Sequence, residues 1–448
     1  MTGFPAEART RPRPRLRDHL RVLGLLLQTL AGVVPFVLHV LVAPVATPIA
    51  RGRLRRLLAE PAEGPETPPP VDPAAWAGKS LFVVAGEPSG DRLAARVVGE
   101  IRRQAPDVRI RGYAGPAVAA AGAVLDRSIV EHAVVGFTAV VATLPTWWRL
   151  CAEALAIFRE DPPDALLTID FPGLNLRLAR WARRAGIRTV HLVAPQTWAW
   201  APWRTGRLRR AVSLLLVTFP FEPRVFRAAG VRAAYVGHPL FEAPLPPPSS
   251  PDAPPSAAPL VELRPGSRRR EVRRQGPIVL EAARAIARRV PDARFLVRLA
   301  SERGRATFDA VLARHGPLPE RHELRLGRGA EEAPVAVALT TSGTSTAELA
   351  AALVPMVVFY RVSMLARLGA RLLVTSPYVA MANLLAGREI VPERLVPAGG
   401  GAALGDEVAG LLADRDRWLR MRGDLATVRA RLAHPDVAAR AASFVLSG

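Results

Sequence analysis

Short apolar runs alternate with amphipathic stretches along most of the chain after residue 79. The first run, Ser80–Ala85, leads through a glycine-containing turn into the amphipathic stretch Arg92–Arg103. The same order recurs where the apolar run Ala165–Ile169 precedes the arginine-rich stretch Leu174–Ala185. Short buried strands that alternate with helices are typical of βαβ units in a parallel sheet. The pattern therefore predicts an α/β fold.

A proline-rich stretch divides this pattern into two halves. It covers residues 241–259, and the strand–helix alternation resumes at Leu260–Leu263. A chain of 448 residues is too long for one ordinary domain. We therefore predict two Rossmann-like domains facing across a cleft, at residues 79–240 and 260–448, the second ending in several helices.

The pattern is different at the N-terminus. Residues 1–21 are polar and basic, whereas Val22–Ala50 is almost wholly apolar and long enough to span a bilayer. Prolines interrupt this run, so we expect residues 1–59 to form a membrane-associated segment. It would be one kinked span, or a re-entrant or interfacial hairpin broken near Pro35. A buried core helix is the alternative, and a proline-rich linker at residues 60–78 would follow.

Composition narrows the classes of function. The formal charge is +22, but nearly all basic residues are arginine, Lys79 being the single lysine. No nucleic-acid-binding signature accompanies this charge, so we expect phosphate ligands or anionic membranes rather than nucleic acid. One cysteine, Cys151, excludes an intramolecular disulfide and fits a reducing compartment. No cluster has metal-ligand spacing, so no metal is expected.

The candidate chemistry of the first half lies where strands end. Asp170 follows Ala165–Ile169 directly, and ligands of parallel sheets bind outside the carboxyl ends of strands. Asp170 could act as a general base, cap the following helix or pair with His191. The turn at 86–91 lacks the three-glycine dinucleotide fingerprint. It could cradle an anion or sugar hydroxyls, or only satisfy backbone geometry.

Two polar loops in the second half suggest a nucleoside-diphosphate site. Ser342-Gly343-Thr344 lies between a strand and a helix, where backbone N–H groups can hold a diphosphate, and Glu348 follows one turn later. Gly266-Ser267-Arg268 occupies the equivalent place after the first strand, and arginine is a natural phosphate partner. The alternatives are a capped helix with a solvated Glu348 and a surface Arg268.

From about Ser80 to Leu446 the chain resembles the lipid-A-disaccharide synthases, which are inverting glycosyltransferases of the two-domain GT-B fold. The motifs that carry the resemblance are AGEPSGD (Ala85–Asp91), TIDFPGLNLRLA (Thr168–Ala179), VHLVAPQTWAW (Val190–Trp200), PFEPRVF (Pro220–Phe226), YVGHPL (Tyr235–Leu240), RPGSRRREVRR (Arg264–Arg274), SGTSTAE (Ser342–Glu348) and NLLAGREIVPE (Asn383–Glu393). Gly173 stands where family members usually carry a second aspartate.

The resemblance assigns roles to individual residues. Asp170 matches the catalytic aspartate. The residues that it implies for nucleotide binding are Gly266, Ser267, Arg268, Ser342, Gly343, Thr344 and Glu348. Those that it implies for the acceptor side or the cleft are Ser89, Gly90, Asp91, Asn383 and Arg388.

The resemblance also implies a reaction and a place. A UDP-activated 2,3-diacylglucosamine would be transferred onto 2,3-diacylglucosamine 1-phosphate, giving lipid A disaccharide and UDP without a cofactor. The enzyme would act at the cytoplasmic face of the inner membrane with membrane lipids as partners; a homodimer is left open. The alternatives are a related GT-B enzyme with another acceptor, a UDP-sugar epimerase, and a non-catalytic membrane-bound UDP-sugar-binding paralogue.

Overall fold

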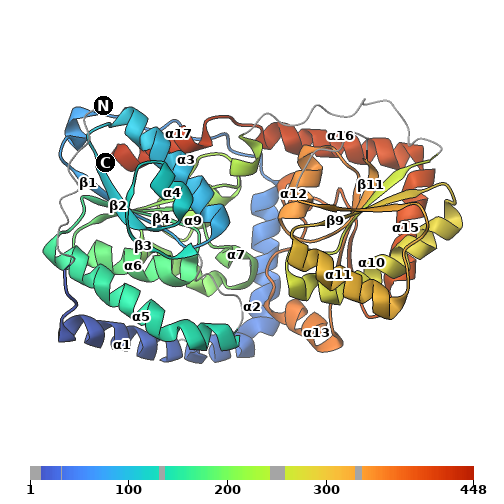
Figure 1. Cartoon of the computed structure of the whole chain (residues 1–448), viewed down its shortest axis with the longest axis horizontal. Helices are drawn as coiled ribbons and strands as arrows, with labels where there is room; N and C mark the ends of the chain where they lie inside the picture. Colours follow the sequence, from blue (N-terminus) through green and yellow to red (C-terminus); the bar gives the residue numbers. More distant parts are fainter. Residues whose placement is uncertain (1–11, 32, 131–136, 243–257, 328–334, 448) are drawn as a thin grey trace. The chain divides into compact units, whose positions relative to one another are not determined.

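The chain divides into two compact units, each built on one parallel sheet (Figure 1). The computed structural model describes residues 12–31, 33–130, 137–242, 258–327 and 335–447. Unit 1 comprises Met1–Ala43, Pro65–Pro239 and Asp436–Gly448, and unit 2 comprises Pro44–Gly64 and Leu240–Pro435. Most of the linker predicted at 241–259 lies outside the described residues.

The sheet of unit 1 has seven parallel strands in the order β3-β2-β1-β4-β5-β6-β7. Their bounds are β1 (Ser80–Ala85), β2 (Arg109–Ala114), β3 (Val124–Ser128), β4 (Ala165–Ile169), β5 (Arg188–Leu192), β6 (Leu214–Val217) and β7 (Ala233–Tyr235). The strand order reverses between β1 and β4, where Ala85 pairs in register with Ile169. Such a reversal is where open α/β sheets bind ligands.

Helices cover both faces of this sheet, and their apolar sides form its core. Within unit 1 the structure describes α1 (Leu16–Ala31), α3 (Pro88–Gln104), α4 (Pro116–Ala120), α5 (Phe137–Glu160), α6 (Pro172–Arg184), α7 (Thr197–Trp200), α8 (Thr205–Ala211), α9 (Glu222–Arg227) and α17 (Val437–Leu446). Short 3-10 helices lie at Ala74–Trp76, Pro202–Arg204 and Pro239–Phe241.

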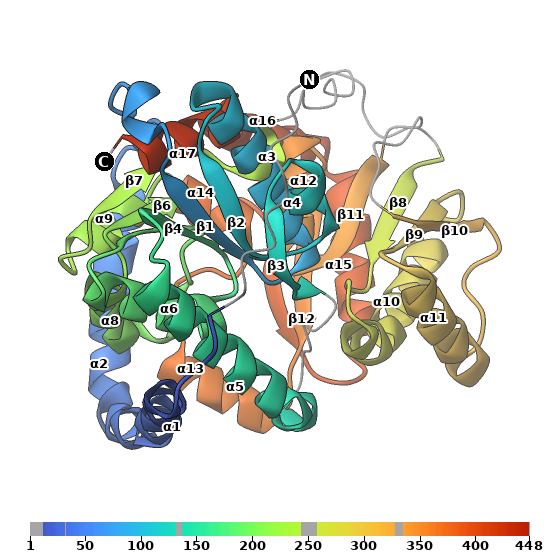
Figure 2. The ribbon, with the colours of Figure 1, turned by 60° about the vertical axis from the view of Figure 1, so that its left-hand side comes forward.

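The last helix corrects the predicted second domain, 260–448. Helix α17 belongs to unit 1 and lies beside α3 (Figure 2). The Trp76 indole donates a hydrogen bond to the Leu446 carbonyl at 2.7 Å, and Arg188 donates one to the Phe444 carbonyl at 2.8 Å. The core of unit 1 thus includes side chains from the C-terminal end of the chain.

The sheet of unit 2 has six parallel strands in the order β10-β9-β8-β11-β12-β13. Their bounds are β8 (Leu260–Arg264), β9 (Arg294–Leu299), β10 (His322–Leu326), β11 (Val335–Thr341), β12 (Met356–Arg361) and β13 (Glu393–Val396). The order reverses between β8 and β11, where Arg264 pairs with Thr340. The helices of this unit are α10 (Arg269–Arg289), α11 (Glu302–His315), α12 (Thr344–Ala351), α13 (Met364–Leu373), α14 (Met381–Ala386), α15 (Gly401–Ala413) and α16 (Arg415–Leu432).

The N-terminal segment is helical. Helix α1 is followed by α2 (Val33–Ala59), and the division between the units falls within α2, after Ala43. In the described part of the chain, no helix is both long and apolar enough to cross a bilayer, so the predicted span is not supported. Helix α1 ends at Ala31 and α2 begins at Val33, close to the break expected near Pro35, and Pro35 itself lies in the first turn of α2, where proline is tolerated.

From Pro65 onward, the proline-rich linker predicted at 60–78 belongs to unit 1. The Glu66 backbone N–H donates to the Tyr235 carbonyl at 2.9 Å, and the Glu66 side chain pairs with Arg227.

The edge strands β3 and β13 had no counterpart among the predicted strands. Both are short, and exposed or polar side chains interrupt their apolar pattern.

Candidate functional site

The turn after β4 delivers Asp170 to the carboxyl edge of the sheet in unit 1. Asp170 and Phe171 both have left-handed backbone conformations, with φ of +48° and +47°. Such conformations in consecutive non-glycine residues are uncommon and are retained where the surroundings enforce them. Here Asn175 enforces them, because its side-chain amide donates to the carbonyls of Asp170 at 2.7 Å and Ile169 at 3.0 Å.

Neither structural role considered for Asp170 is observed. Helix α6 has Phe171 at its N-cap position and no side-chain cap. The ring of His191 is fully buried, and its Nδ1 lies 2.8 Å from the Thr168 hydroxyl. Burial raises the pKa of the half-buried Asp170 carboxyl above its ordinary 3.8, and the Phe171 N–H partly opposes this shift. A carboxylate with a raised pKa at a sheet edge is suited to accept a proton.

The glycine turn before α3 is different from the prediction. Helix α3 begins at Pro88, so Ser89, Gly90 and Asp91 form its first turn rather than a loop. The Asp91 carboxylate is buried and accepts hydrogen bonds from the N–H groups of Gly115 at 2.7 Å and Ala117 at 3.0 Å. These bonds satisfy the N-terminus of α4, so Asp91 has a structural role.

Ser89 remains an accessible part of this turn, whereas Gly86 is buried. A side chain at Gly86 would lie 2.6 Å from the Phe171 ring, so glycine lets Phe171 cover the end of β1. Ser89 is exposed, and Gly90 is buried close to the Ile169 carbonyl. Gly173, in the first turn of α6, has no atom within 4 Å of its added Cβ, so an aspartate would find space there.

The Glu271 side chain caps the loop after β8. Arg268 is the N-cap of α10, and the Glu271 carboxylate accepts from the N–H groups of Ser267 at 3.0 Å and Arg268 at 3.2 Å. Gly266 has a φ of +121°, and a Cβ there would lie 2.6 Å from that of Glu271. The loop therefore requires glycine, and it leaves the Arg268 guanidinium two-thirds exposed, within 3.3 Å of Glu271.

The loop after β11 lies beside it, because β8 and β11 are neighbours. Gly343, with a φ of +135°, is the N-cap of α12, and the Ser342 hydroxyl donates to the Val379 carbonyl at 3.2 Å. Helix α12 begins at Thr344 and points its N-terminus to this edge. The two phosphate loops predicted from sequence thus lie on adjacent strand ends at the reversal of the sheet, where an anion is favoured.

Glu348 is held by a buried charge network that sequence reasoning missed. The Arg264 guanidinium donates to Glu348 at 2.7 Å and to Glu262 at 2.9 Å, and Glu262 also pairs with Arg298 at 2.5 Å. The only feature of the sequence that could have indicated this network is the alternation of charged residues within the strands. The network fixes Glu348 one turn into α12, and a carboxylate can still accept further hydrogen bonds there.

The NLLAGREIVPE motif (Asn383–Glu393) has a structural function. The Asn383 side chain is fully buried and donates to the Val391 carbonyl at 2.8 Å and to Glu393 at 2.7 Å. Its oxygen accepts from the N–H groups of Ile390 at 2.7 Å and Val391 at 2.9 Å. Arg388 is exposed and pairs with Asp424 of α16 at 2.5 Å. The Asn383 side chain is therefore not displayed for a ligand in this structure, whereas Arg388 lies at the surface in an ion pair.

Glu222 is a second residue that sequence reasoning missed. Its fully buried carboxyl accepts from the Trp198 indole at 3.1 Å and from the N–H groups of Thr218 at 3.3 Å and Phe219 at 3.1 Å. It thereby joins the loops that follow β5 and β6. Burial raises its pKa from 4.5 to about 7. The PFEP motif (Pro220–Pro223) was the only sequence feature at this position, and no role was predicted for Glu222.

Comparison with known proteins identifies the family. A family model described as lipid-A-disaccharide synthetase matches residues 81–430. The lipid-A-disaccharide synthase of Anaeromyxobacter dehalogenans (strain 2CP-C) is 37% identical over 375 residues, covering 82% of this chain and 96% of that protein. The synthase of Chromobacterium violaceum is 36% identical over 378 residues, with coverages of 82% and 96%.

A solved structure agrees in fold. Arabidopsis thaliana UGT89C1 aligns with a TM-score of 0.52 at 13% identity, covering 85% of this chain and 99% of its own. With two parallel-sheet α/β units, each with polar loops at the reversal of its strand order, the protein resembles glycosyltransferases of the GT-B class in fold. The chain belongs to the lipid-A-disaccharide synthase family. It is thus a glycosyltransferase of lipid A biosynthesis.

Proposed function

We propose that the protein transfers a 2,3-diacylglucosamine from its UDP form onto 2,3-diacylglucosamine 1-phosphate. The products are lipid A disaccharide 1-phosphate and UDP. Family membership supports the reaction. Arg268 and the backbone N–H groups at the start of α12 are hydrogen-bond donors at the sheet edge of unit 2, and they support the binding of a sugar nucleotide through its diphosphate. In this proposal unit 2 holds the nucleotide and unit 1 supplies Asp170.

The donor diphosphate would lie against the two loops of unit 2. The backbone N–H groups at Ser342–Thr344 and the N-terminus of α12 offer hydrogen bonds and a favourable dipole. Arg268 adds a charged donor from the neighbouring loop, which Gly266 and Ser267 shape, and Glu348 would accept from ribose hydroxyls. These groups stabilise the negative charge that develops on the leaving diphosphate.

Asp170 would act on the acceptor. The acceptor hydroxyl oxygen attacks the anomeric carbon, the bond from that carbon to the phosphate oxygen breaks, and its electron pair leaves with UDP. The hydroxyl proton passes to the Asp170 carboxylate, whose raised pKa matches this task. Attack opposite the leaving group inverts the anomeric centre. The observation that carries this assignment is a half-buried carboxylate at the sheet reversal that is neither a helix cap nor a partner of His191.

The donor site can be tested by removing one charge. Arg268→Ala should weaken UDP binding by about tenfold or more, because a hydrogen bond to a charged group contributes about 1.5–3 kcal/mol. Arg270→Ala, which removes an exposed arginine of the same helix, is the matched control. Calorimetric titration with UDP measures both variants. Equal losses in the two would show that general charge, not the loop, binds the nucleotide.

Product analysis tests the reaction itself. Mass spectrometry should detect the disaccharide only when both acylated sugars are present, and UDP should form in equal amount. Conversion of the UDP-sugar without any acceptor would instead indicate an epimerase. UDP formation with other hydroxyl acceptors but not this one would indicate a different acceptor.

We also propose that the N-terminal helices hold the enzyme on the cytoplasmic face of the inner membrane, lying on the surface rather than spanning it. Helix α2 exposes Leu41, Val45 and Ile49, spaced four residues apart on one face, at 71%, 68% and 67% of their surface. An exposed apolar stripe on a helix favours the interface of a bilayer.

A further inference from the structure

Helix α1 buries an acidic residue against unit 1 and exposes several leucines, the reverse of the usual pattern for a surface helix. Asp18 is fully buried, and it forms an ion pair with Arg159 of α5. The opposite pattern holds for Leu16, Leu20 and Leu23, which are exposed at 77%, 57% and 43%. Their spacing of four and three places them on one face of the helix. Helix α1 is therefore held on unit 1 by the Asp18–Arg159 ion pair and the buried Val22, and presents these three leucines outward.

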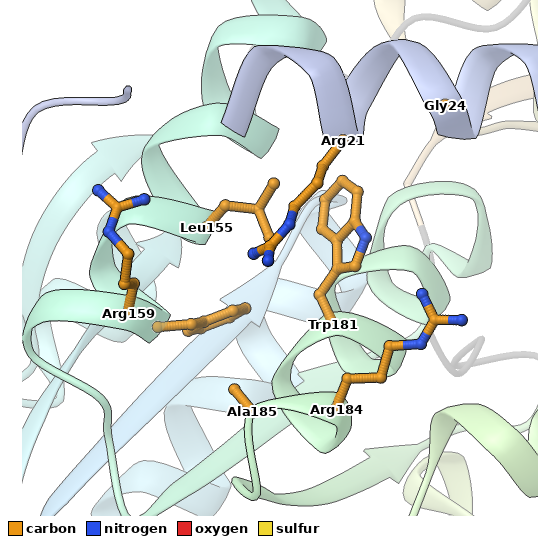
Figure 3. Close-up of a pocket in the computed structure, with 8 residues that line it drawn as sticks. Arg21, Gly24, Leu155, Arg159, Trp181, Arg184 and Ala185 are labelled. Atoms are coloured by element: carbon orange, nitrogen blue, oxygen red, sulfur yellow. The ribbon is translucent and has the colours of Figure 1, made fainter. Parts of the chain in front are cut away.

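A pocket of about 480 Å³ lies beneath α1 and between α5 and α6 (Figure 3). Its floor is apolar, formed by Leu155, Phe158 and Trp181, which are all at least nine-tenths buried. Arg21 reaches from α1 between Leu155 and Trp181 into this space (Figure 3). The pocket thus combines an apolar floor with a cation aimed into it.

The charge around the pocket is unbalanced. Arg159 is neutralised by Asp18 and Glu160. Arg21 and Arg184, which also line the pocket, form no ion pair with any residue in the described ranges. Burial, then repulsion from Arg184 and from arginines of α8, lowers the pKa of the adjacent Arg180. Such a crowd of guanidinium groups favours an anionic ligand.

We propose that this pocket binds an anionic phospholipid, with the phosphate on Arg21 and Arg184 and the acyl chain against the apolar floor, while the outward leucines of α1 contact the membrane. The inference rests on the proposed membrane association and names its lipid partner. Arg21 and the leucines precede the residues matched by the family model, so the site belongs to the N-terminal segment of this chain. A phosphate group satisfies the guanidinium groups, whereas a zwitterionic head group would bring a competing cation.

The pocket is tested first without a membrane. The full-length protein is titrated with dihexanoyl phosphatidylglycerol, dihexanoyl phosphatidylcholine or inorganic phosphate, all below micelle formation. Phosphatidylglycerol should bind at least tenfold more tightly than either alternative. Arg21→Gln with Arg184→Gln should weaken it roughly thirtyfold, since each arginine near anionic lipid contributes about one kcal/mol. The control pair is Arg303→Gln with Arg314→Gln, two exposed arginines of α11 in unit 2.

Three outcomes would overturn the pocket: equal binding of both lipids, tight binding of inorganic phosphate alone, or equal losses in the two pairs of variants. Vesicle sedimentation then separates the two proposals. Replacing Leu16, Leu20 and Leu23 with serine should abolish binding to phosphatidylglycerol vesicles while the soluble lipid still binds. If wild-type protein binds the soluble lipid but no vesicles, the pocket stands and the membrane association is wrong. If it binds vesicles but not the soluble lipid, the pocket is wrong.

Discussion

Replacing Asp170 with asparagine separates chemistry from folding unusually well. The residue has a φ of +48°, a conformation that asparagine adopts as readily as aspartate, so the backbone of the turn should persist. The amide oxygen can still accept from the Phe171 N–H. Burial raises the pKa of the aspartate, which means that its charged form costs the fold free energy above the ordinary pKa of 3.8. Asparagine avoids this cost, so the free energy of unfolding should not fall at neutral pH.

Catalysis should change by a much larger amount. A positioned general base contributes about 10²–10⁴ in rate, which corresponds to roughly 2.7–5.4 kcal/mol of transition-state stabilisation. We expect kcat to fall by this factor, as measured by UDP release, while the Kd for UDP stays within about twofold because the phosphate loops belong to unit 2. The wild-type rate should decline on the acid side at a higher pH than an ordinary aspartate would give, and the variant should lack this decline.

Asp170→Ala provides the contrast. Alanine in a left-handed conformation costs about 1–2 kcal/mol, so this variant should lose stability as well as rate. If Asp170→Asn keeps more than about a tenth of the wild-type kcat, Asp170 is not the base. The proton would then have to pass to another group at this edge.

The other predictions concern positions where backbone conformation or a buried polar group determines UDP binding or stability. Gly266→Ala should weaken UDP binding about tenfold by calorimetry, since a left-handed alanine costs about 1–2 kcal/mol and its Cβ would meet Glu271 at 2.6 Å; Gly410→Ala, with open space around it, should leave UDP binding unchanged. Asn383→Ala should lower the free energy of unfolding by about 3 kcal/mol or more in urea, because four buried hydrogen bonds lose their partner; a loss below about 1 kcal/mol would contradict its structural role. Glu222 has a folded pKa raised from 4.5 to about 7, so its stabilising contribution is complete below pH 4.5 and is lost as the pH rises towards 7. The stability of Glu222→Gln relative to wild type should therefore rise by about 3 kcal/mol across that window, and a constant difference would show that Glu222 does not titrate there.

Much of the site could be predicted because strand ends are local features of sequence. The five residues Ala165–Ile169 are β4 in the structure, and Asp170 follows that strand. The loops at Gly266–Arg268 and Ser342–Thr344 likewise follow β8 and β11. Parallel sheets bring such ends to one edge, so apolar runs and the polar residues after them indicate where ligands bind.

Roles that depend on distant partners could not be read in this way. Asp91 was expected near the acceptor, but its carboxylate caps α4 through Gly115, 24 residues later. Nothing in the AGEPSGD motif reveals that partner, since a buried carboxylate and an exposed one look alike in sequence. The same holds for Glu348, which lies beside Arg264, 84 residues earlier.

The sequence by itself determined the α/β class, the edge on which the candidate residues lie and the family to which they belong, because these depend on hydrophobic period and ordered motifs. The tertiary structure decided which of those residues remain open to a ligand, since hydrogen bonding to remote backbone removes Asp91 and Asn383 from that set. It also decided that α17 completes unit 1, because Trp76 and Arg188 find their acceptors only there. The sequence shows which residues are polar, but the fold determines which partner each polar side chain binds.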